Sequence, residues 1–192
     1  MIYVIIVLAV LVLWVISTYN FFVSSKARIK ASVQEIGNQL KRQSGLIPNL
    51  EESVKGYLKH EKGIFESLTE ARKLVAAAAK SGDLNKMADA GEAFAKVLPK
   101  LQVVVEDNPE LKGNEVVANL MDELRDTADK VMYSRRLLID LTADFNVRRV
   151  SFPSSLVANV FKISEQPGLI TPEHGGHMEV SESDLNTPKV KI

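Results

Sequence analysis

Residues 1–23, MIYVIIVLAVLVLWVISTYNFFV, decide the fold, because they contain no charged side chain and almost no polar one before Ser17. A helix that crosses a bilayer needs about 20 predominantly apolar residues, and this stretch provides them. Aromatic rings favour the headgroup level of a membrane. The sequence therefore predicts a transmembrane anchor over 1–23, whose C-terminal end carries Trp14, Tyr19, Phe21 and Phe22.

Two other interpretations of this stretch fit less well. A cleaved signal peptide has a basic n-region and a small-residue cleavage site. Here no Lys or Arg precedes the apolar run, and Ser17-Thr18-Tyr19 is not such a site. A helix of a soluble core would have a polar face, and residues 1–16 have none.

The charged residues that follow the anchor give it a direction. Lys26, Arg28 and Lys30 come directly after it, whereas no basic residue precedes it. Cytoplasmic flanks of membrane spans are enriched in Lys and Arg, so we expect Met1 outside and the rest of the chain in the cytoplasm. The three basic side chains would lie beside anionic membrane lipid, each adding up to about 1 kcal/mol of attraction.

The composition excludes several classes of function. The chain has 192 residues, 24 basic and 24 acidic side chains, three His and no Cys. A disulfide framework and a cysteine nucleophile are excluded, and the charge balance gives no reason to expect nucleic acid. The pair His60-Glu61 lacks the second His of a zinc-protease helix, because position 64 is Ile. Without a phosphate loop or a Ser-His-Asp arrangement, we expect no metal, no cofactor and no enzymatic activity.

Beyond the anchor, apolar residues recur at steps of three and four, which average 3.5 and predict helices packed as in a coiled coil. No segment alternates with period two, so no sheet is expected. The predicted fold is all-α, with the transmembrane helix continuing into an antiparallel up-down bundle of four long helices over 24–150. The four apolar sets are Ile29, Val33, Ile36, Leu40; Leu50, Val54, Tyr57, Ile64, Leu68, Ala71, Val75, Ala78; Leu84, Met87, Gly91, Phe94, Leu98, Leu101, Val105; and Val117, Leu120, Leu124, Val131, Leu138, Leu141, Phe145, with Thr127 and Ser134 on the last seam.

Glycine, proline and capping residues predict the helix boundaries. The first helix is expected to continue without interruption from the anchor and to end at Ser44-Gly45, with Pro48 in the first turn of the second. Pro99 lies inside the third helix, where we expect a kink or a break. The residues predicted to form the other turns and caps are Gly82, Asp83, Asn108, Pro109 and Asn114.

A short segment after the fourth helix, 151–163, is predicted to be amphipathic. Four apolar side chains share one helical face there, and two arginines precede it. Up-down topology returns the segment to the membrane side, where it would lie in the interface with the arginines beside lipid phosphates. Alternatively, the segment closes the end of the bundle core. The sequence does not decide between these two placements. The apolar side chains are Phe152, Leu156, Val160 and Phe161, and the arginines are Arg148 and Arg149.

The last part of the chain, 164–192, is rich in Pro, Gly, Ser and Glu, and is expected to be a disordered tail. Its two histidines, His174 and His177, are a weak metal signal. Glu61 falls on the predicted seam of the second helix, where a carboxylate must be paired or lie at an exposed edge. Its candidate partners are His60, Arg135 and Arg136.

Several ordered motifs resemble the LemA family over roughly Tyr19 to Phe161, about three-quarters of the chain. LemA-like proteins are bacterial membrane proteins with one N-terminal span and an antiparallel helical bundle. The resemblance therefore implies this architecture and a bacterial inner-membrane location, and it implies no enzyme activity. The motifs are Tyr19-Asn20, Leu40-Lys41-Arg42, Leu46-Ile47-Pro48-Asn49-Leu50, Val54-Lys55-Gly56-Tyr57, His60-Glu61, Thr69-Glu70-Ala71-Arg72, Asn108-Pro109-Glu110-Leu111-Lys112, Phe145-Asn146 and Ser151-Phe152-Pro153-Ser154.

Polar motif residues have two possible roles. They would bind a partner peptide or hold helix ends, and the need of helix ends for polar caps favours the second role. Departures from the family pattern occur at Val33, Gly37, Pro99 and Phe145. The polar motif residues are Asn49, Tyr57 and Asn146.

The sequence supports a structural or interaction protein that associates with itself at the membrane, as a scaffold or in membrane shaping. The fourth helix carries a second apolar face, which predicts another packing partner and hence a homo-oligomer. The alternative is an adaptor or regulator of a membrane enzyme, such as a protease or a signalling protein. The second face consists of Met121, Ala128, Met132 and Ile139.

Overall fold

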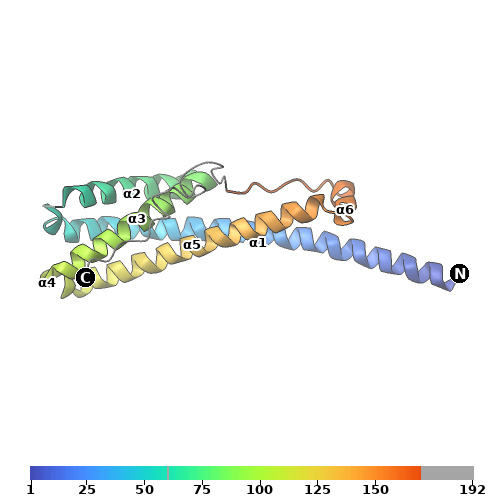
Figure 1. The fold of residues 1–192 in the computed structure, drawn as a ribbon, viewed down its shortest axis with the longest axis horizontal. Helices are drawn as coiled ribbons and strands as arrows, with labels where there is room; N and C mark the ends of the chain where they lie inside the picture. The colour runs from blue at the N-terminus through green and yellow to red at the C-terminus, as the bar shows by residue number, and fades with distance from the viewer. Residues whose placement is uncertain (60, 170–192) are drawn as a thin grey trace, which may run out of the picture.

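The protein is an elongated assembly of helices in a computed structural model that describes residues 1–59 and 61–169 (Figure 1). No strand occurs in these ranges, which confirms the all-α fold. A short 3-10 helix, η1, follows the first helix. The elements are α1 (Ile2–Val54), η1 (Tyr57–Lys59), α2 (Lys62–Ser81), α3 (Leu84–Asp107), α4 (Pro109–Lys112), α5 (Glu115–Val150) and α6 (Ser154–Val160).

Helix α1 is continuous for 53 residues, about 80 Å. The prediction that it ends at Ser44-Gly45 is wrong, because the helix runs through Pro48 to Val54. Its buried stripe explains why. Ile36, Leu40, Gln43, Ile47, Leu50 and Val54 are all buried at steps of three and four. Packing along this stripe outweighs the weak helix propensity of Gly45 and the hydrogen bond lost at Pro48.

The chain turns between Lys55 and Glu61, inside the segment that was predicted to be one long second helix. Leu58 is buried in this corner, while Gly56 and Tyr57 are exposed. Helix α2 then begins at Lys62. The predicted second helix is therefore divided between the end of α1 and a shorter α2.

The predicted caps of the later helices are confirmed. The Asp83 carboxylate accepts hydrogen bonds from the backbone N–H groups of Asn85 (2.9 Å) and Lys86 (3.3 Å). Asn114 caps α5 in the same way, and Gly82 adopts a left-handed φ of 66° at the end of α2. A glycine tolerates this conformation without steric cost. Helix α3 continues through Pro99 without the break that was considered.

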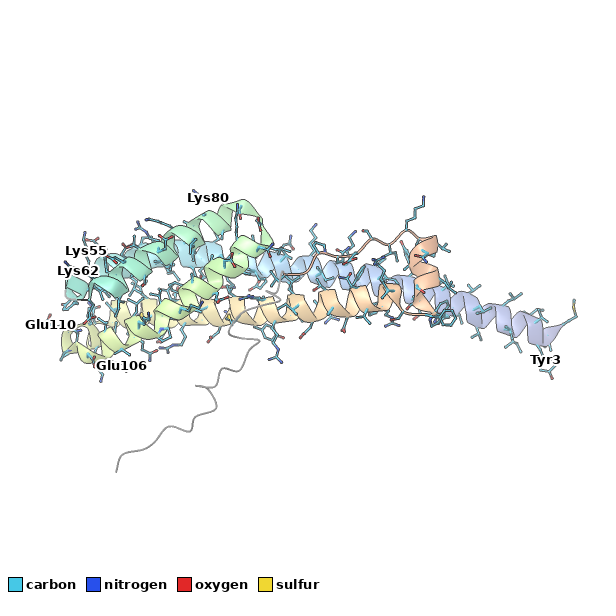
Figure 2. All side chains as sticks on the ribbon, turned by 45° about the horizontal axis from the view of Figure 1, so that its top comes forward. Tyr3, Lys55, Lys62, Lys80, Glu106 and Glu110 are labelled. Atoms are coloured by element: carbon cyan, nitrogen blue, oxygen red, sulfur yellow. The ribbon has the colours of Figure 1, made fainter. Side chains whose placement is uncertain are left out.

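The long helices run in alternating directions, but they do not form four equal layers. Helices α1 and α5 lie side by side as a long antiparallel pair, and the α2–α3 hairpin covers only the part of this pair away from the N-terminus (Figure 1). Figure 2 shows the charged residues Lys55, Lys62, Glu106 and Glu110 at the opposite end of the molecule from Tyr3. We call the two ends of the α1–α5 pair the anchor end, near Tyr19 and α6, and the corner end, near α4.

The core follows the predicted seams of α3 and α5. Phe94, Leu124, Leu138 and Phe145 are fully or almost fully buried. Helices α3 and α5 approach closely at Gly91, where a Cβ atom would lie 2.7 Å from Cγ1 of Val131. Glycine is therefore required there for close helix packing.

The N-terminal part of α1 extends beyond every other element. An 18-residue window of this helix has a mean hydropathy of 2.6, and only 6% of it is buried within the protein. Its length and composition suit a membrane span, and a signal sequence has the same features. The helix continues without interruption into the bundle, as the sequence predicts.

Candidate membrane interface

Aromatic and basic side chains from three elements meet at the anchor end. The Phe22 ring on α1 lies 5.2 Å from the Phe145 ring of α5 in an edge-to-face arrangement. The Tyr19 ring lies 4.8 Å from the Phe161 ring, which follows α6. The guanidinium carbon of Arg148 lies 4.0 Å above the Phe21 ring, a cation–π geometry. The structure thus gathers a predicted set of interface residues at one level of α1.

The other predicted interface residues surround this cluster. Trp14 lies five residues nearer the N-terminus, about 7.5 Å along the helix. Lys26, Arg28 and Lys30 are exposed on the side toward the bundle. Arg149 is held by Glu165 at 3.0 Å. Along α1, apolar, aromatic and basic residues therefore follow one another in that order.

Helix α6 presents its apolar face to the outside. Val157 and Ala158 are buried on the opposite face, and the Ser154 hydroxyl donates to the Arg148 carbonyl at 2.7 Å. The apolar face of α6 that points outward therefore does not close the end of the bundle core. The exposed fractions on that face are 82% for Phe152, 55% for Leu156, 75% for Val160 and 48% for Phe161. The peptide bond between Phe152 and Pro153, just before α6, is cis.

The segment after α6 returns along the bundle, and we call residues 163–169 the strap. Asn146 holds its backbone with two hydrogen bonds. The side-chain amide donates to the Gln166 carbonyl (2.9 Å), and the Gln166 N–H donates to the Asn146 side-chain oxygen (3.0 Å). Ile163 and Leu169 pack against the core. Residues 164–169 of the strap belong to the segment predicted as a disordered tail. The rest of that segment, including His174 and His177, lies outside the described residues.

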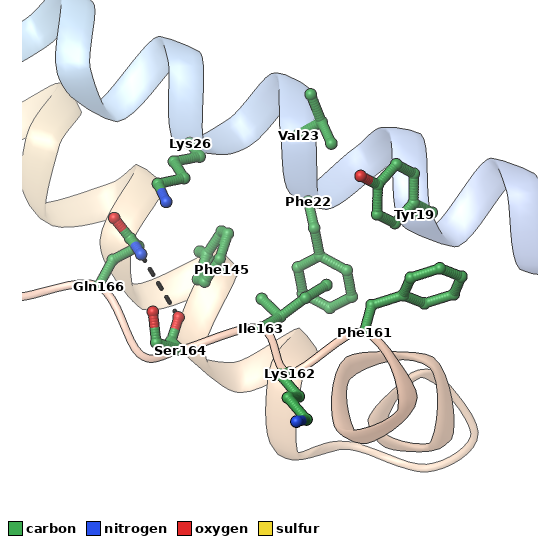
Figure 3. A pocket seen from close by; sticks show the side chains of 10 residues that line it. All are labelled: Tyr19, Phe22, Val23, Lys26, Phe145, Phe161, Lys162, Ile163, Ser164 and Gln166. Atoms are coloured by element: carbon green, nitrogen blue, oxygen red, sulfur yellow. Dashed lines mark hydrogen bonds between the residues drawn. The ribbon is translucent and has the colours of Figure 1, made fainter.

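A cleft of about 210 Å³ lies between α1, the end of α5 and the chain that leaves α6 (Figure 3). Tyr19 and Phe161 stand at one end of it, and Lys26 and Gln166 at the other (Figure 3). The cleft is therefore apolar toward the N-terminal span and polar toward the bundle. Its remaining lining residues are Phe22, Val23, Phe145, Lys162, Ile163 and Ser164.

Several family motifs lie at the corner end, far from the cleft. The Tyr57 hydroxyl donates to a Glu110 carboxylate oxygen at 2.7 Å, and this bond raises the pKa of Tyr57 above its ordinary value. Glu51 of α1 accepts from Thr69 (3.1 Å) and pairs with Arg72 (2.8 Å) of α2. These polar residues link elements at the corner. The motif residues in this region are Leu46, Ile47, Pro48, Asn49, Leu50, Gly56 and Tyr57.

Glu61 does not face the core. It is exposed and precedes α2, where its carbonyl accepts from the backbone N–H groups of Ile64 and Phe65. Arg135, one of its candidate partners, pairs instead with Glu92 of α3 (3.4 Å). Lys96 and Arg135 hold the pKa of Glu92 below its ordinary range. His60 lies outside the described residues.

The described part of the chain contains no group of three or more His, Cys, Asp or Glu side chains that could hold a metal ion. No curated protein matches the chain. The sequence profile of the LemA family matches residues 32–181. This match covers most of the bundle, α6 and the strap, and we conclude that the chain belongs to the LemA family.

Proposed function

We propose that this protein is a membrane-anchored structural protein whose helix α6 lies in the interface of the bilayer that α1 crosses. The observation that carries the proposal is the outward apolar face of α6. Phe152, Leu156 and Val160 project from the protein at the level of Tyr19, where the apolar part of α1 ends. An exposed apolar face on a short helix beside a span suits the boundary between headgroups and acyl chains.

The order of residues along α1 supports the same placement. With the apolar residues in the bilayer, Tyr19 and Phe22 stand at the headgroup level, and Lys26 reaches the anionic surface. The basic flank supports an orientation with the bundle in the cytoplasm and Met1 outside. Because α1 is one continuous helix, the bundle is mounted rigidly and close to the membrane.

The position of α6 can be tested with single cysteines, since the chain has none of its own. In liposomes, an environment-sensitive fluorophore on Leu156→Cys or Val160→Cys is expected to be quenched by lipid-attached quenchers and protected from aqueous iodide. Ser155→Cys, about 140° around the helix from Val160, and Glu106→Cys at the corner end are the controls. They are expected to show the reverse pattern. Equal iodide access at Val160 and Glu106 would contradict the proposal.

The protein further acts by pairing with a second copy, as a scaffold. Met121 and Ala128 of the predicted second face are buried, whereas Met132 and Ile139 are exposed, so half of that face is used within the chain. The groove of about 470 Å³ between α1 and α5 is a better surface for pairing with a second copy. It is lined by apolar and small side chains, with charged residues at its rims. The lining is Arg28, Ala31, Ser32, Glu35, Lys130, Tyr133, Ser134, Leu137 and Leu141.

A second copy suits this groove for two reasons. Copies anchored in one bilayer share height and orientation, which raises their effective concentration at the groove. The groove lining carries both signs of charge. Glu35 of each copy can meet Lys130 of the other across a two-fold axis if Lys130 leaves Asp126, its partner within the chain at 2.7 Å.

Pairing predicts a position-dependent cross-link. Tyr133→Cys, at the groove, is expected to form disulfide-linked dimers in membranes on mild oxidation. Ala143→Cys is the matched control on α5, exposed and turned roughly 160° from Leu141. If both cysteines cross-link equally, or neither does, the groove is not the site of pairing. Absence of any dimer would favour the second candidate function, an adaptor whose groove receives another membrane protein.

A further inference from the structure

The cleft at the anchor end has the polarity of an amphiphile. Its apolar end, at Tyr19 and Phe161, faces the N-terminal span, and its polar end, at Lys26 and Gln166, faces the bundle (Figure 3). Lys26 follows Tyr19 by seven residues, so the two ends are about 10.5 Å apart along α1. The headgroup region on each side of a bilayer is about 5–7 Å thick, so a lipid with its phosphate at Lys26 would place the upper part of its acyl chains beside Tyr19.

The charges around the cleft favour a negative headgroup. Lys26 and Lys162 line it, and neither forms an ion pair within the described residues. Arg149 and Glu165, which lie nearby on α5 and the strap, neutralise each other at 3.0 Å. The cleft therefore contributes positive charge that no carboxylate in the described chain offsets, at a depth where phosphates are concentrated if α1 crosses the bilayer.

Two features give the cleft a defined shape. The paired hydrogen bonds between Asn146 and Gln166 fix the strap at its polar end. The packed rings of Phe22 and Phe145 form its floor, and Phe161 is held against Tyr19. A fixed cleft loses little conformational entropy when it is filled, which distinguishes it from a loose array of surface lysines.

We propose that this cleft binds one anionic phospholipid per chain, with the phosphate at Lys26 and the acyl chains along Tyr19, Phe22 and Phe161. The proposal rests on the proposed placement of α1 and α6 in the membrane. The proposed site would bind one lipid per chain and prefer one type of headgroup. General contact between α1 and the surrounding bilayer has neither property.

The test counts retained lipids by native mass spectrometry of the full chain released from nanodiscs of phosphatidylcholine with a minor share of phosphatidylglycerol. We expect one phosphatidylglycerol per chain to stay bound to the wild-type protein. Lys26→Gln is expected to lower the retained fraction about fivefold, equivalent to about 1 kcal/mol, because it removes the charged group that would hold the phosphate in the cleft.

The matched control is Arg28→Gln, which removes the same charge from the same level of α1, roughly 160° around the helix from Lys26. It is expected to leave retention unchanged. If both variants lost the same fraction of retained phosphatidylglycerol, the binding would come from general attraction between the basic flank and the membrane. That result would overturn the site. Equal retention of phosphatidylcholine would overturn it too.

The two proposals fail in different ways. Fluorophores on α6 that are protected from iodide, together with no headgroup preference, would contradict the lipid site alone. Fluorophores exposed to water would contradict the placement of α6 itself. Circular dichroism of Lys26→Gln checks that the exposed substitution leaves the helices intact.

Discussion

Replacing Phe145 with alanine is expected to lower the free energy of unfolding of the full chain by about 3–5 kcal/mol, the usual cost of truncating a buried Phe. Phe145 is almost completely buried on α5, and its ring meets Phe22 of α1 edge to face at 5.2 Å. The substitution removes apolar contacts and leaves a cavity at the anchor end, where α1, α5, α6 and the strap meet. Denaturant unfolding in mild detergent, followed by far-UV circular dichroism, measures the change.

The control is Val147→Ala, two residues away and exposed. It is expected to change the free energy of unfolding by less than about 0.5 kcal/mol. A double-mutant cycle with Phe22→Leu and Phe145→Leu isolates the ring contact, which should contribute about 0.5–1.5 kcal/mol. Equal losses in Phe145→Ala and Val147→Ala would mean that the anchor end is not packed as described.

Phe145 also connects stability to the proposed function. The buried Val157–Ala158 face of α6 packs beside this part of the α1–α5 pair, and the cleft has Phe145 in its floor. If the two helices separate here, α6 loses the surface that sets its height. A helix that lies in the membrane interface needs such a support, because Phe152, Leu156 and Val160 on its outer face are exposed.

The helical fold could be predicted from sequence because its seams are regular. Steps of three and four placed Phe94, Leu124 and Leu138 in the core without any knowledge of tertiary contacts. The boundary between the first two helices could not be predicted, since local signals at Gly45 and Pro48 opposed a seam that continued through them. The buried residue Gln43 added to this difficulty, because a polar residue at a seam position interrupts the apolar pattern between Leu40 and Ile47.

The candidate interface was partly predictable for a related reason. Phe152, Leu156 and Val160 lie at helical spacing, so their common face is visible in the sequence, but which way it points depends on how α6 packs. The position of the strap was not predictable, because the Asn146 side chain holds the backbone of Gln166, and such a contact leaves no pattern in the sequence. A polar residue in the last turns of a helix gives no sign of a partner 20 residues later.

Gln43→Leu is expected to raise the free energy of unfolding by about 1–3 kcal/mol, the penalty of a buried polar group without a hydrogen bond. Gln43 is 0% exposed on α1, and neither its Nε2 nor its Oε1 has a hydrogen-bond partner within the described residues. Leucine has a similar volume and continues the seam between Leu40 and Ile47. Thermal and denaturant unfolding in mild detergent should both detect the gain.

Two substitutions separate this effect from a general gain in hydrophobicity. Gln34→Leu makes the same change at an exposed position of α1 and should alter stability by less than about 0.5 kcal/mol. Thr127→Val changes another buried polar seam residue, but its hydroxyl already donates to the Leu124 carbonyl at 2.8 Å, so no comparable gain is expected. A stability of Gln43→Leu at or below that of the wild type would mean that the amide is satisfied in solution.

A higher stability of Gln43→Leu would mean that Gln43 lowers the stability of the protein, which raises the question of what else the residue does in the α1 seam. An uninterrupted aliphatic stripe over α1 can pair with its neighbours in more than one register. A polar seam residue makes these registers unequal in energy, because each register places it against different neighbours. Register matters in this fold because α1 continues into the apolar span. A shift of one heptad would move the bundle by about 10.5 Å along α1 and carry α6 away from the level of Tyr19.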